Sequence, residues 1–266
     1  MSDIRFEFRE IGGQRLHIAS RLLHLSDETP LLIFNGIGAG AELLEPLLLK
    51  LNIPSITFDI PGIGGSPVSS GISRMHNFAD LALELLNKLG ISKVHVMGVS
   101  WGGGLAQQFA YQHPERSDCL ILAATSTGHL MVPPSPRVLF HMATPLRYLS
   151  GYYFSRIAGE IYGGDFRSDQ ARVSAHIKRM GPPSMAGYLG QLYAMTGWTS
   201  AFFLHKISQK TLVMAGTDDP IIPLVNARFI AKRIPDSKLE LYDCGHLFML
   251  TRIDRVTASI ESFVAS

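Results

Sequence analysis

Short apolar runs alternate with longer stretches of helical period along most of this chain. Such alternation is typical of an α/β protein with a mostly parallel sheet. Residues 4–25 predict a hairpin that turns at Gly12-Gly13, and six further short apolar runs bounded by Gly, Pro or polar residues predict buried strands. These runs are Leu31–Asn35, Ser55–Asp59, Lys93–Gly98, Cys119–Ala124, Thr211–Ala215 and Lys238–Tyr242. Together with the hairpin they predict an eight-stranded sheet.

The stretches between these runs have the apolar spacing of helices that bury one face. Met75–Leu89 repeats apolar residues every three or four positions, which predicts an amphipathic helix. Leu105–His113 and Val225–Ile234 each stop before a proline, and the residue before a proline disfavours the helical conformation. A last helix is predicted from about Asp254 to Phe263.

The alternation breaks between residues 128 and 205. This segment is rich in proline, contains no clear buried strand and holds half of the chain's Phe, Tyr and Trp residues. We therefore predict a helical insertion after the sixth strand, which divides the chain into a core of residues 1–127 and 206–266 and a lid of residues 128–205. The alternative is an extra helical layer that only packs against the core.

Composition narrows the class of protein. The chain has 266 residues, of which 46% are hydrophobic and 17% charged, and this is enough to bury a large core without cross-links. A net charge of +2 does not indicate a nucleic-acid partner. Cys119 and Cys244 match no metal or redox spacing, so we expect both to be reduced.

Targeting signals are not evident in the sequence. Charges at Arg5, Glu7 and Arg9 interrupt the apolar residues near the N-terminus, which indicates a strand rather than a signal peptide. No apolar run approaches the roughly 18 residues of a membrane helix. The expectation is a cytoplasmic enzyme without a transmembrane segment.

The strongest chemical signal is the G-x-S-x-G sequence Gly98-Val99-Ser100-Trp101-Gly102. A predicted strand precedes it and a predicted helix follows, as a nucleophile elbow requires. In such an elbow a sharp turn exposes the serine Oγ at the carboxyl edge of the sheet, where α/β proteins bind ligands. Ser100 is therefore the predicted nucleophile.

A serine hydroxyl needs a base to take its proton. Of the ten histidines, His246 alone follows the end of a strand late in the chain, so it is the predicted base. The acid that orients this histidine is expected in the turn after Thr211–Ala215, where Asp218 and Asp219 are both candidates. The chain order of serine, acid and histidine is that of the α/β-hydrolase fold. Nothing in the sequence indicates a metal site.

Two backbone N–H groups must stabilise the developing oxyanion. One is expected from Trp101, directly after the nucleophile. The other is expected from Ile37, in the Gly-containing turn after Leu31–Asn35. The sequence Gly62-Ile63-Gly64-Gly65 lacks the full dinucleotide fingerprint, so we interpret it as the turn after a core strand.

The sequence around these motifs resembles that of the intracellular medium-chain-length poly(3-hydroxyalkanoate) depolymerases. The similarity extends from about residue 30 to 250 and includes the predicted lid. The matching segments are Leu31–Ala39, Val99–Ala110, Leu122–Thr125, Met131–Pro133, Ile161–Gly164, Gly197–Ser200 and Gly245–Phe248.

The resemblance implies hydrolysis of ester bonds in a polyester stored as granules, with release of 3-hydroxy acids through an acyl-enzyme and without a cofactor. It implies a triad of Ser100, Asp219 and His246, since the family's acid precedes the proline at position 220. It also implies a cytoplasmic location at the granule surface, with the granule or another acyl ester as the partner.

The aromatic and methionine side chains of the predicted lid suit an acyl pocket, because methionine adapts to varied shapes. The candidate lining residues are Met142, Met185, Tyr188, Met195, Trp198 and Phe202. Two other functions stay open. The same triad would serve a small-ester or lactone hydrolase or a 3-hydroxyacyl transferase, and an idle triad would suit a ligand receptor or a granule-associated protein.

Overall fold

The computed structural model describes residues 4–24, 28–69, 71, 73–144, 150–179 and 184–266. Positions 145–149 and 180–183 of the predicted lid thus lie outside the described residues. The strands are β1 (Arg5–Ile11), β2 (Gln14–Arg21), β3 (Leu31–Phe34), β4 (Ser55–Phe58), β5 (Val94–Val99), β6 (Ser117–Ala123), β7 (Lys210–Gly216) and β8 (Ser237–Tyr242). The α-helices are α1 (Glu45–Lys50), α2 (Met75–Lys88), α3 (Trp101–Gln112), α4 (Pro136–Ala143), α6 (Gly151–Tyr162), α7 (Gln170–Arg179), α8 (Met185–Met195), α9 (Leu224–Arg233), α10 (Phe248–Thr251) and α11 (Ile253–Val264). Short 3₁₀ helices are η1 (Ala41–Leu44), η2 (Pro114–Arg116), η3 (Gly164–Arg167) and η4 (Leu204–Lys206).

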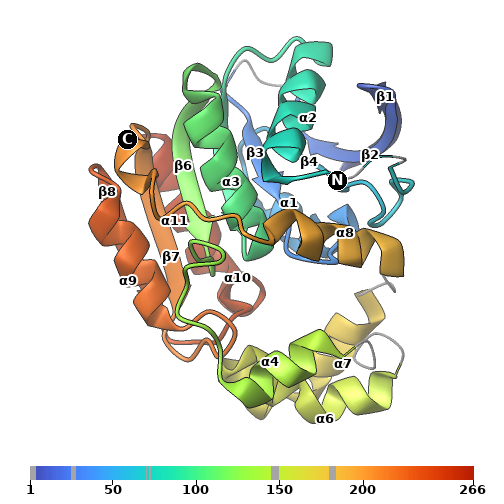
Figure 1. Cartoon of the computed structure of the whole chain (residues 1–266), viewed down its shortest axis with the longest axis vertical. Coiled ribbons are helices and arrows are strands. Elements are labelled where there is room, and N and C mark those ends of the chain that lie inside the picture. The colour runs from blue at the N-terminus through green and yellow to red at the C-terminus, as the bar shows by residue number, and fades with distance from the viewer. Residues whose placement is uncertain (1–3, 25–27, 70, 72, 145–149, 180–183) are drawn as a thin grey trace.

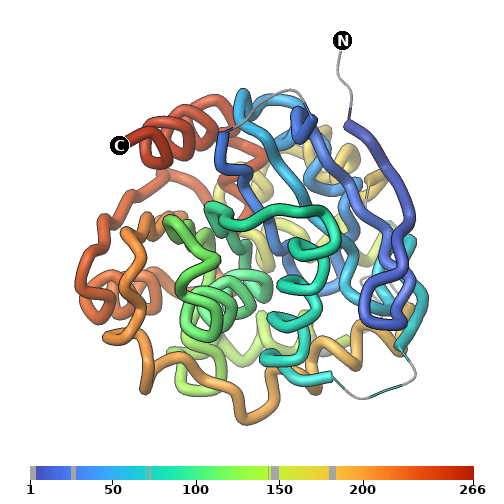
Figure 2. Tube along the Cα trace, turned by 90° about the horizontal axis from the view of Figure 1, so that it is seen from above, coloured from blue at the N-terminus to red at the C-terminus, as the bar shows by residue number. Residues whose placement is uncertain are grey.

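The eight strands form one sheet in the order β1-β2-β4-β3-β5-β6-β7-β8. The pairs β1–β2 and β2–β4 are antiparallel, and the other five pairs are parallel. Figure 2 shows the blue N-terminal hairpin and the orange and red C-terminal elements at opposite edges of the molecule. The eight-stranded, mostly parallel sheet that the sequence predicts is therefore confirmed.

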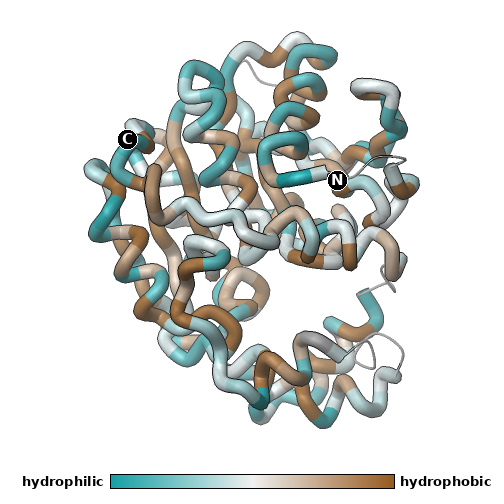
Figure 3. The backbone as a smooth tube through the Cα atoms, viewed as in Figure 1, coloured by the Kyte–Doolittle hydropathy of each residue, from teal (hydrophilic) through white to brown (hydrophobic). Residues whose placement is uncertain are grey.

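Helices cover both faces of the sheet (Figure 1). The buried side chains of α2, α3 and α9 belong to one apolar cluster, and those of α1, α10 and α11 belong to a second. In Figure 3 the apolar residues follow the central strands, whereas hydrophilic residues gather on the outer sides of the helices. The amphipathic spacing of the helical stretches thus reports which face each helix buries.

The segment between β6 and β7 contains α4, α6, α7 and α8 (Figure 1). Helices α4, α6 and α7 lie together beyond the carboxyl ends of the strands, and their buried side chains form two small apolar clusters, one of which also includes Ile221 of the core. Helix α8 lies against the core, where the Trp101 Nε1 donates a hydrogen bond to the Gln191 carbonyl at 3.0 Å. The insertion is thus attached to the core from two sides.

Three sequence predictions need correction. Helix α3 begins at Trp101 rather than at Leu105, because three consecutive glycines weaken the helical signal without preventing the helix. The run Lys238–Tyr242 was expected to be buried, but only Tyr242 is, since β8 is an edge strand. The helical turns of η1 and α1 were not predicted, because the run there is short and carries a proline at position 46.

Cys119 and Cys244 are both buried, and no disulfide joins them. Within the part of the chain that the structure describes, no helix has the length and apolar character needed to cross a membrane.

Candidate active site

Ser100 occupies a strained turn between β5 and α3. Its φ of 53° and ψ of −117° lie in a region that non-glycine residues rarely adopt. The turn is held by the Ser100 N–H, which donates to the Ala123 carbonyl at 2.9 Å, and by the Thr125 Oγ1, which donates to the Ser100 carbonyl at 2.6 Å. The hydroxyl itself has no hydrogen-bond partner among the described residues. These contacts hold the backbone and leave Oγ available.

Glycines on both sides of Ser100 make this turn sterically feasible. A Cβ on Gly98 would lie 2.2 Å from the Gly102 carbonyl oxygen, and a Cβ on Gly102 would lie 2.2 Å from the Phe34 carbonyl oxygen. The second contact joins the elbow to the turn after β3. The G-x-S-x-G pattern therefore has a packing cause that is independent of the reaction.

His246 and Asp219 form a buried pair beside Ser100. The His246 Nδ1 lies 2.7 Å from the Asp219 Oδ2, and the two residues are 5% and 8% exposed. Because a carboxylate only accepts hydrogen bonds, Nδ1 carries the proton and Nε2 is left as the basic nitrogen. The ring of His246 also stacks on Tyr162 of α6, with centroids 6.3 Å apart.

The two neighbouring aspartates of this turn, Asp218 and Asp219, have different partners in the structure. The Asp219 Oδ1 accepts from the Ile221 and Ile222 N–H groups, both at 2.9 Å, which aims its other oxygen at His246. Asp218 instead accepts two hydrogen bonds from the Arg167 guanidinium, both at 2.9 Å. The guanidinium holds the pKa of Asp218 below its usual value. Asp218 thus attaches the insertion to the core, and only Asp219 faces His246.

The turn after β3 lies next to the elbow and is held by side chains. The Asn35 Nδ2 donates to the Gly40 carbonyl and its Oδ1 accepts from the Gly36 N–H, each at 2.8 Å. The Gly38 N–H donates to the Gln191 Oε1 at 2.7 Å. Gln191, on α8 of the insertion, is 2% exposed and was not singled out by its sequence context.

The two expected oxyanion donors border Ser100. The Ile37 N–H and the Trp101 N–H make no hydrogen bond to any described residue. Ile37 lines the pocket around Ser100, and Trp101 begins α3, so that its N–H is one of the free donors at the start of that helix. Both groups are therefore available to an oxyanion.

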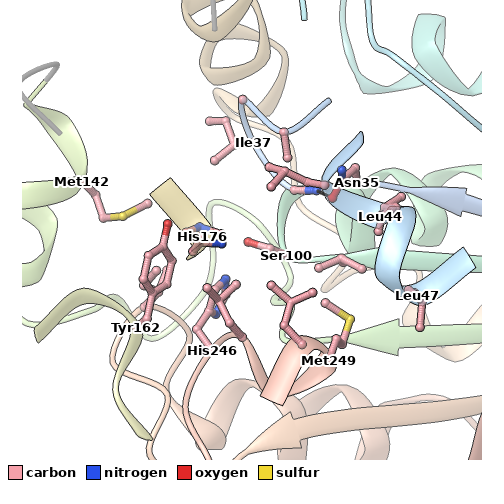
Figure 4. A pocket seen from close by; sticks show the side chains of 18 residues that line it. Asn35, Ile37, Leu44, Leu47, Ser100, Met142, Tyr162, His176, His246 and Met249 are labelled. Atoms are coloured by element: carbon pink, nitrogen blue, oxygen red, sulfur yellow. Dashed lines mark hydrogen bonds between the residues drawn. The ribbon is translucent and has the colours of Figure 1, made fainter. Parts of the chain in front are cut away.

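A pocket of about 820 Å³, counting the part open to solvent, contains Ser100 and His246. Figure 4 shows Ser100 and His246 turned toward the same cavity, with Tyr162 and His176 on the side of the insertion. Aliphatic side chains make most of the remaining wall: Leu43, Leu44, Leu47, Val99, Met142, Ile221, Leu247, Met249 and Leu250.

Of the six side chains of the insertion that the sequence nominated, Met142 alone lines this pocket. Tyr188 is buried, and its hydroxyl donates to the Met142 carbonyl at 3.2 Å. Met195 and Trp198 pack against the core. Met185 and Phe202 are 49% and 72% exposed. None of these five side chains lines the pocket.

The aliphatic wall comes mainly from two segments that the sequence prediction missed. One is η1 with α1, a few residues after the turn that holds Ile37, and the other follows His246 directly. Their closeness along the chain to Ile37 and His246 is the signal that could have found them.

A second buried His–Asp pair lies away from the pocket. The His17 Nδ1 is 2.7 Å from the Asp59 Oδ2, and Glu42 lies nearby. These three residues could hold a cation by distance alone. However, Asp59 also accepts from the Ala41 N–H at 2.6 Å and from the Gly65 N–H at 2.8 Å, so that both its oxygens are already occupied. Burial raises the pKa of Asp59. The pair thus holds together the turn at 60–66, which follows β4.

Comparisons with known proteins agree with the fold. The family model described as the alpha/beta hydrolase fold matches residues 29–253. The chain is 48% identical to a poly(3-hydroxyalkanoate) depolymerase of Ectopseudomonas oleovorans over 97% of this chain and 92% of that protein. It is 26% identical to a putative carbamate hydrolase of a Caulobacter species, over 90% of this chain and 92% of that one.

Solved structures superpose over nearly the whole chain. An enol-lactonase from Burkholderia xenovorans LB400 gives a TM-score of 0.84 at 18% identity, covering 98% of this chain and all of that one. An esterase from Exiguobacterium antarcticum gives 0.81 at 20% identity, covering 97% and 99%. Identities this low report the fold alone. The family match and the 48% identical relative show more: this chain belongs to the α/β-hydrolase family, in the branch that includes the Ectopseudomonas depolymerase.

Proposed function

We propose that this protein is a serine hydrolase that cleaves ester bonds of medium-chain-length poly(3-hydroxyalkanoate) and releases 3-hydroxy acids. The observation that carries the proposal is the aliphatic pocket that Ser100 and His246 both line, with Asp219 hydrogen-bonded to His246 behind it. The identity to a poly(3-hydroxyalkanoate) depolymerase supports the choice of substrate.

The reaction begins when the His246 Nε2 takes the proton of the Ser100 hydroxyl as Oγ bonds to the ester carbonyl carbon. The carbonyl oxygen becomes an oxyanion that accepts hydrogen bonds from the Ile37 and Trp101 N–H groups. Collapse of this intermediate breaks the ester C–O bond, and His246 gives its proton to the departing alkoxide of the polymer. A 3-hydroxyacyl group then remains on Ser100.

Water completes the cycle. His246 takes a proton from a water molecule whose oxygen attacks the acyl carbon, and it returns that proton to the Ser100 Oγ as the acid leaves. Asp219 stays ionised and stabilises the imidazolium in both steps. No cofactor takes part in this scheme.

The aliphatic wall suits the substrate. The side chain of a medium-length monomer is a hydrocarbon, and each buried methylene favours binding by about 0.8 kcal/mol. Residues 128–205, whose α4, α6 and α7 lie over the pocket, act as a lid in this proposal. The enzyme would meet its polymer at the surface of a cytoplasmic granule.

The test combines one substitution with two substrates. Three purified proteins are incubated with medium-chain and short-chain polyester granules: wild type, Ser100→Ala and Ser155→Ala. Ser155→Ala is the control, because Ser155 lies on α6 away from the pocket. Products are identified by mass spectrometry. Wild type and the control are expected to release 3-hydroxy acids from medium-chain granules, and Ser100→Ala to lose at least about 10⁴-fold in rate.

Two results would point elsewhere. Fast hydrolysis of 4-nitrophenyl acetate without granule clearing would indicate a small-ester hydrolase. Failure of Ser100 to react with a fluorophosphonate probe would indicate a protein that binds a ligand without catalysis.

A further inference from the structure

His176 presents a polar group to the pocket that the mechanism does not use. It belongs to α7 of the insertion and lines the same pocket as Ser100 and His246 (Figure 4). The residue is 8% exposed. Its ring packs against Phe154, Tyr162 and Phe166, with centroid distances of 6.0, 5.5 and 5.7 Å. The aromatic contacts fix the plane of the imidazole.

Neither ring nitrogen of His176 has a hydrogen-bond partner among the described residues. Nδ1 is fully buried, whereas Nε2 keeps some accessible surface. Buried polar groups in folded proteins are almost always paired, and an exception needs an explanation. A ligand in the pocket could pair with Nε2, the one ring nitrogen of His176 that is not fully buried.

The charge state of His176 restricts that ligand. Burial lowers the pKa of His176 to about 4, so that the imidazole is neutral near pH 7. A neutral imidazole donates from one nitrogen and accepts at the other. It therefore suits a neutral hydroxyl or ester oxygen better than a carboxylate, which binds best to a cation.

The other polar side chains of the pocket are already engaged. Asn35 bonds the Gly36 and Gly40 backbone, and His246 bonds Asp219. Tyr162 is engaged as well, and its ring stacks on His246. Ser100 is the proposed nucleophile. Among the described lining residues His176 is thus the polar side chain left to recognise a substrate atom.

A 3-hydroxyacyl group carries such an atom close to the reacting bond. Carbon 3 lies two bonds beyond the carbonyl carbon that Ser100 attacks, and it bears an oxygen that a plain fatty acyl chain lacks. In an aliphatic pocket this oxygen would be buried without a partner. We propose that His176 binds the oxygen on C3 of the acyl group and so makes the pocket selective for 3-hydroxyacyl esters.

This inference rests on the proposed function, because it assumes attack by Ser100 on an acyl ester. It makes His176 a specificity-determining residue rather than a participant in proton transfer. A site that pairs with a substrate hydroxyl discriminates strongly against the analogue without it, whereas an aliphatic pocket alone does not.

The experiment measures the ratio of kcat/KM for a 3-hydroxyacyl ester to kcat/KM for the plain acyl ester. The substrates are the 4-nitrophenyl esters of 3-hydroxyoctanoate, 3-acetoxyoctanoate and octanoate, and the two enantiomers at C3 are assayed separately. Wild type is compared with His176→Phe, which keeps the aromatic packing, and with His176→Gln, whose amide nitrogen lies about as far along the side chain as Nε2. The matched control is His141→Phe, a histidine of α4 that bonds the Tyr153 hydroxyl at 2.9 Å and does not line the pocket.

Wild type is expected to prefer one enantiomer of the 3-hydroxy ester over octanoate. The ratio of the two kcat/KM values should fall by about tenfold in His176→Phe, recover at least in part in His176→Gln and stay unchanged in His141→Phe. The oxygen on C3 is a free hydroxyl at the end of the polymer and an ester oxygen in an internal unit, and the 3-acetoxy ester distinguishes the two. If the 3-acetoxy ester is preferred over octanoate as well, His176 binds the ester oxygen of an internal unit. If that preference is lost, His176 binds the hydroxyl of a chain end.

An unchanged ratio in His176→Phe would overturn the inference, and so would a wild type that does not distinguish the 3-hydroxy ester from octanoate. Either result leaves the proposed function intact as long as the esters are hydrolysed and the hydrolysis needs Ser100. A wild type that hydrolyses none of the three esters would instead refute the proposed function itself.

Discussion

Replacement of Asp219 by asparagine tests the orientation of the proposed base. The Asp219 Oδ1 accepts two backbone hydrogen bonds, from Ile221 and Ile222. In Asp219→Asn the amide oxygen must keep that place, because an NH₂ group there would face two N–H donors. The NH₂ group then points at the His246 Nδ1 and forces that nitrogen to accept. The proton moves to Nε2, the nitrogen that must be free to deprotonate Ser100.

The magnitude follows from the same hydrogen bonds. Turning the amide round would restore the reactive tautomer but would leave two buried N–H groups unpaired, at about 1–3 kcal/mol each. The total of roughly 2–6 kcal/mol corresponds to a loss of about 30-fold to 10⁴-fold, since 1.4 kcal/mol is tenfold. Adding the lost stabilisation of the imidazolium, we expect kcat to fall about 10⁴-fold.

The assay is hydrolysis of 4-nitrophenyl octanoate at neutral pH, with kcat and KM determined separately. KM should change little, because Asp219 does not line the pocket. Asp218→Asn is the matched control: it weakens a surface pair with Arg167 that is worth at most about 1 kcal/mol, so that kcat should stay within about fivefold. Thermal unfolding verifies that both variants are folded. The reasoning fails if Asp219→Asn keeps a tenth of wild-type kcat, or if Asp218→Asn is the more damaged enzyme.

Three further predictions follow from other contacts. Gly102→Ala places a Cβ 2.2 Å from a carbonyl oxygen and should lower the unfolding free energy in urea by about 3 kcal/mol, whereas Gly190→Ala, with nothing within 4 Å, should raise it by up to about 1 kcal/mol. Gln191→Leu leaves the Gly38 N–H without its acceptor and should cost about 1–3 kcal/mol of stability together with a lower kcat; an unaltered kcat would mean that this bond does not position the turn. The pKa of His176 is lowered to about 4 in the folded protein, whereas in the unfolded chain it is about 6.5. Protonation of His176 therefore favours the unfolded chain, and the unfolding free energy falls by up to about 3 kcal/mol as the pH drops from 6.5 to 4. Urea titrations of His176→Phe should show a correspondingly smaller fall across that window, and an identical fall would contradict it.

The sequence by itself determined the sheet and the order of the candidate residues, because both depend on local pattern. Six apolar runs of strand length each became a strand within a few residues of the expected bounds. Ser100, Asp219 and His246 each follow a strand, and parallel strands end at one edge of the sheet, so that their order along the chain already placed them near one another. The glycines around Ser100 added the close approach that the elbow needs.

Only the tertiary structure decided what surrounds Ser100. The choice between Asp218 and Asp219 depends on which oxygen two backbone N–H groups hold, and the sequence shows two adjacent aspartates without that difference. The nominated side chains of the insertion failed as pocket residues, except for Met142, because the path of α8 is set by long-range contacts such as the Gln191–Gly38 hydrogen bond. His176 looked like one of several histidines in a helical segment. Its burial beside Ser100, without a hydrogen-bond partner among the described residues, exists only when α7 is folded over the carboxyl ends of the strands. No local pattern records a contact between residues so far apart along the chain.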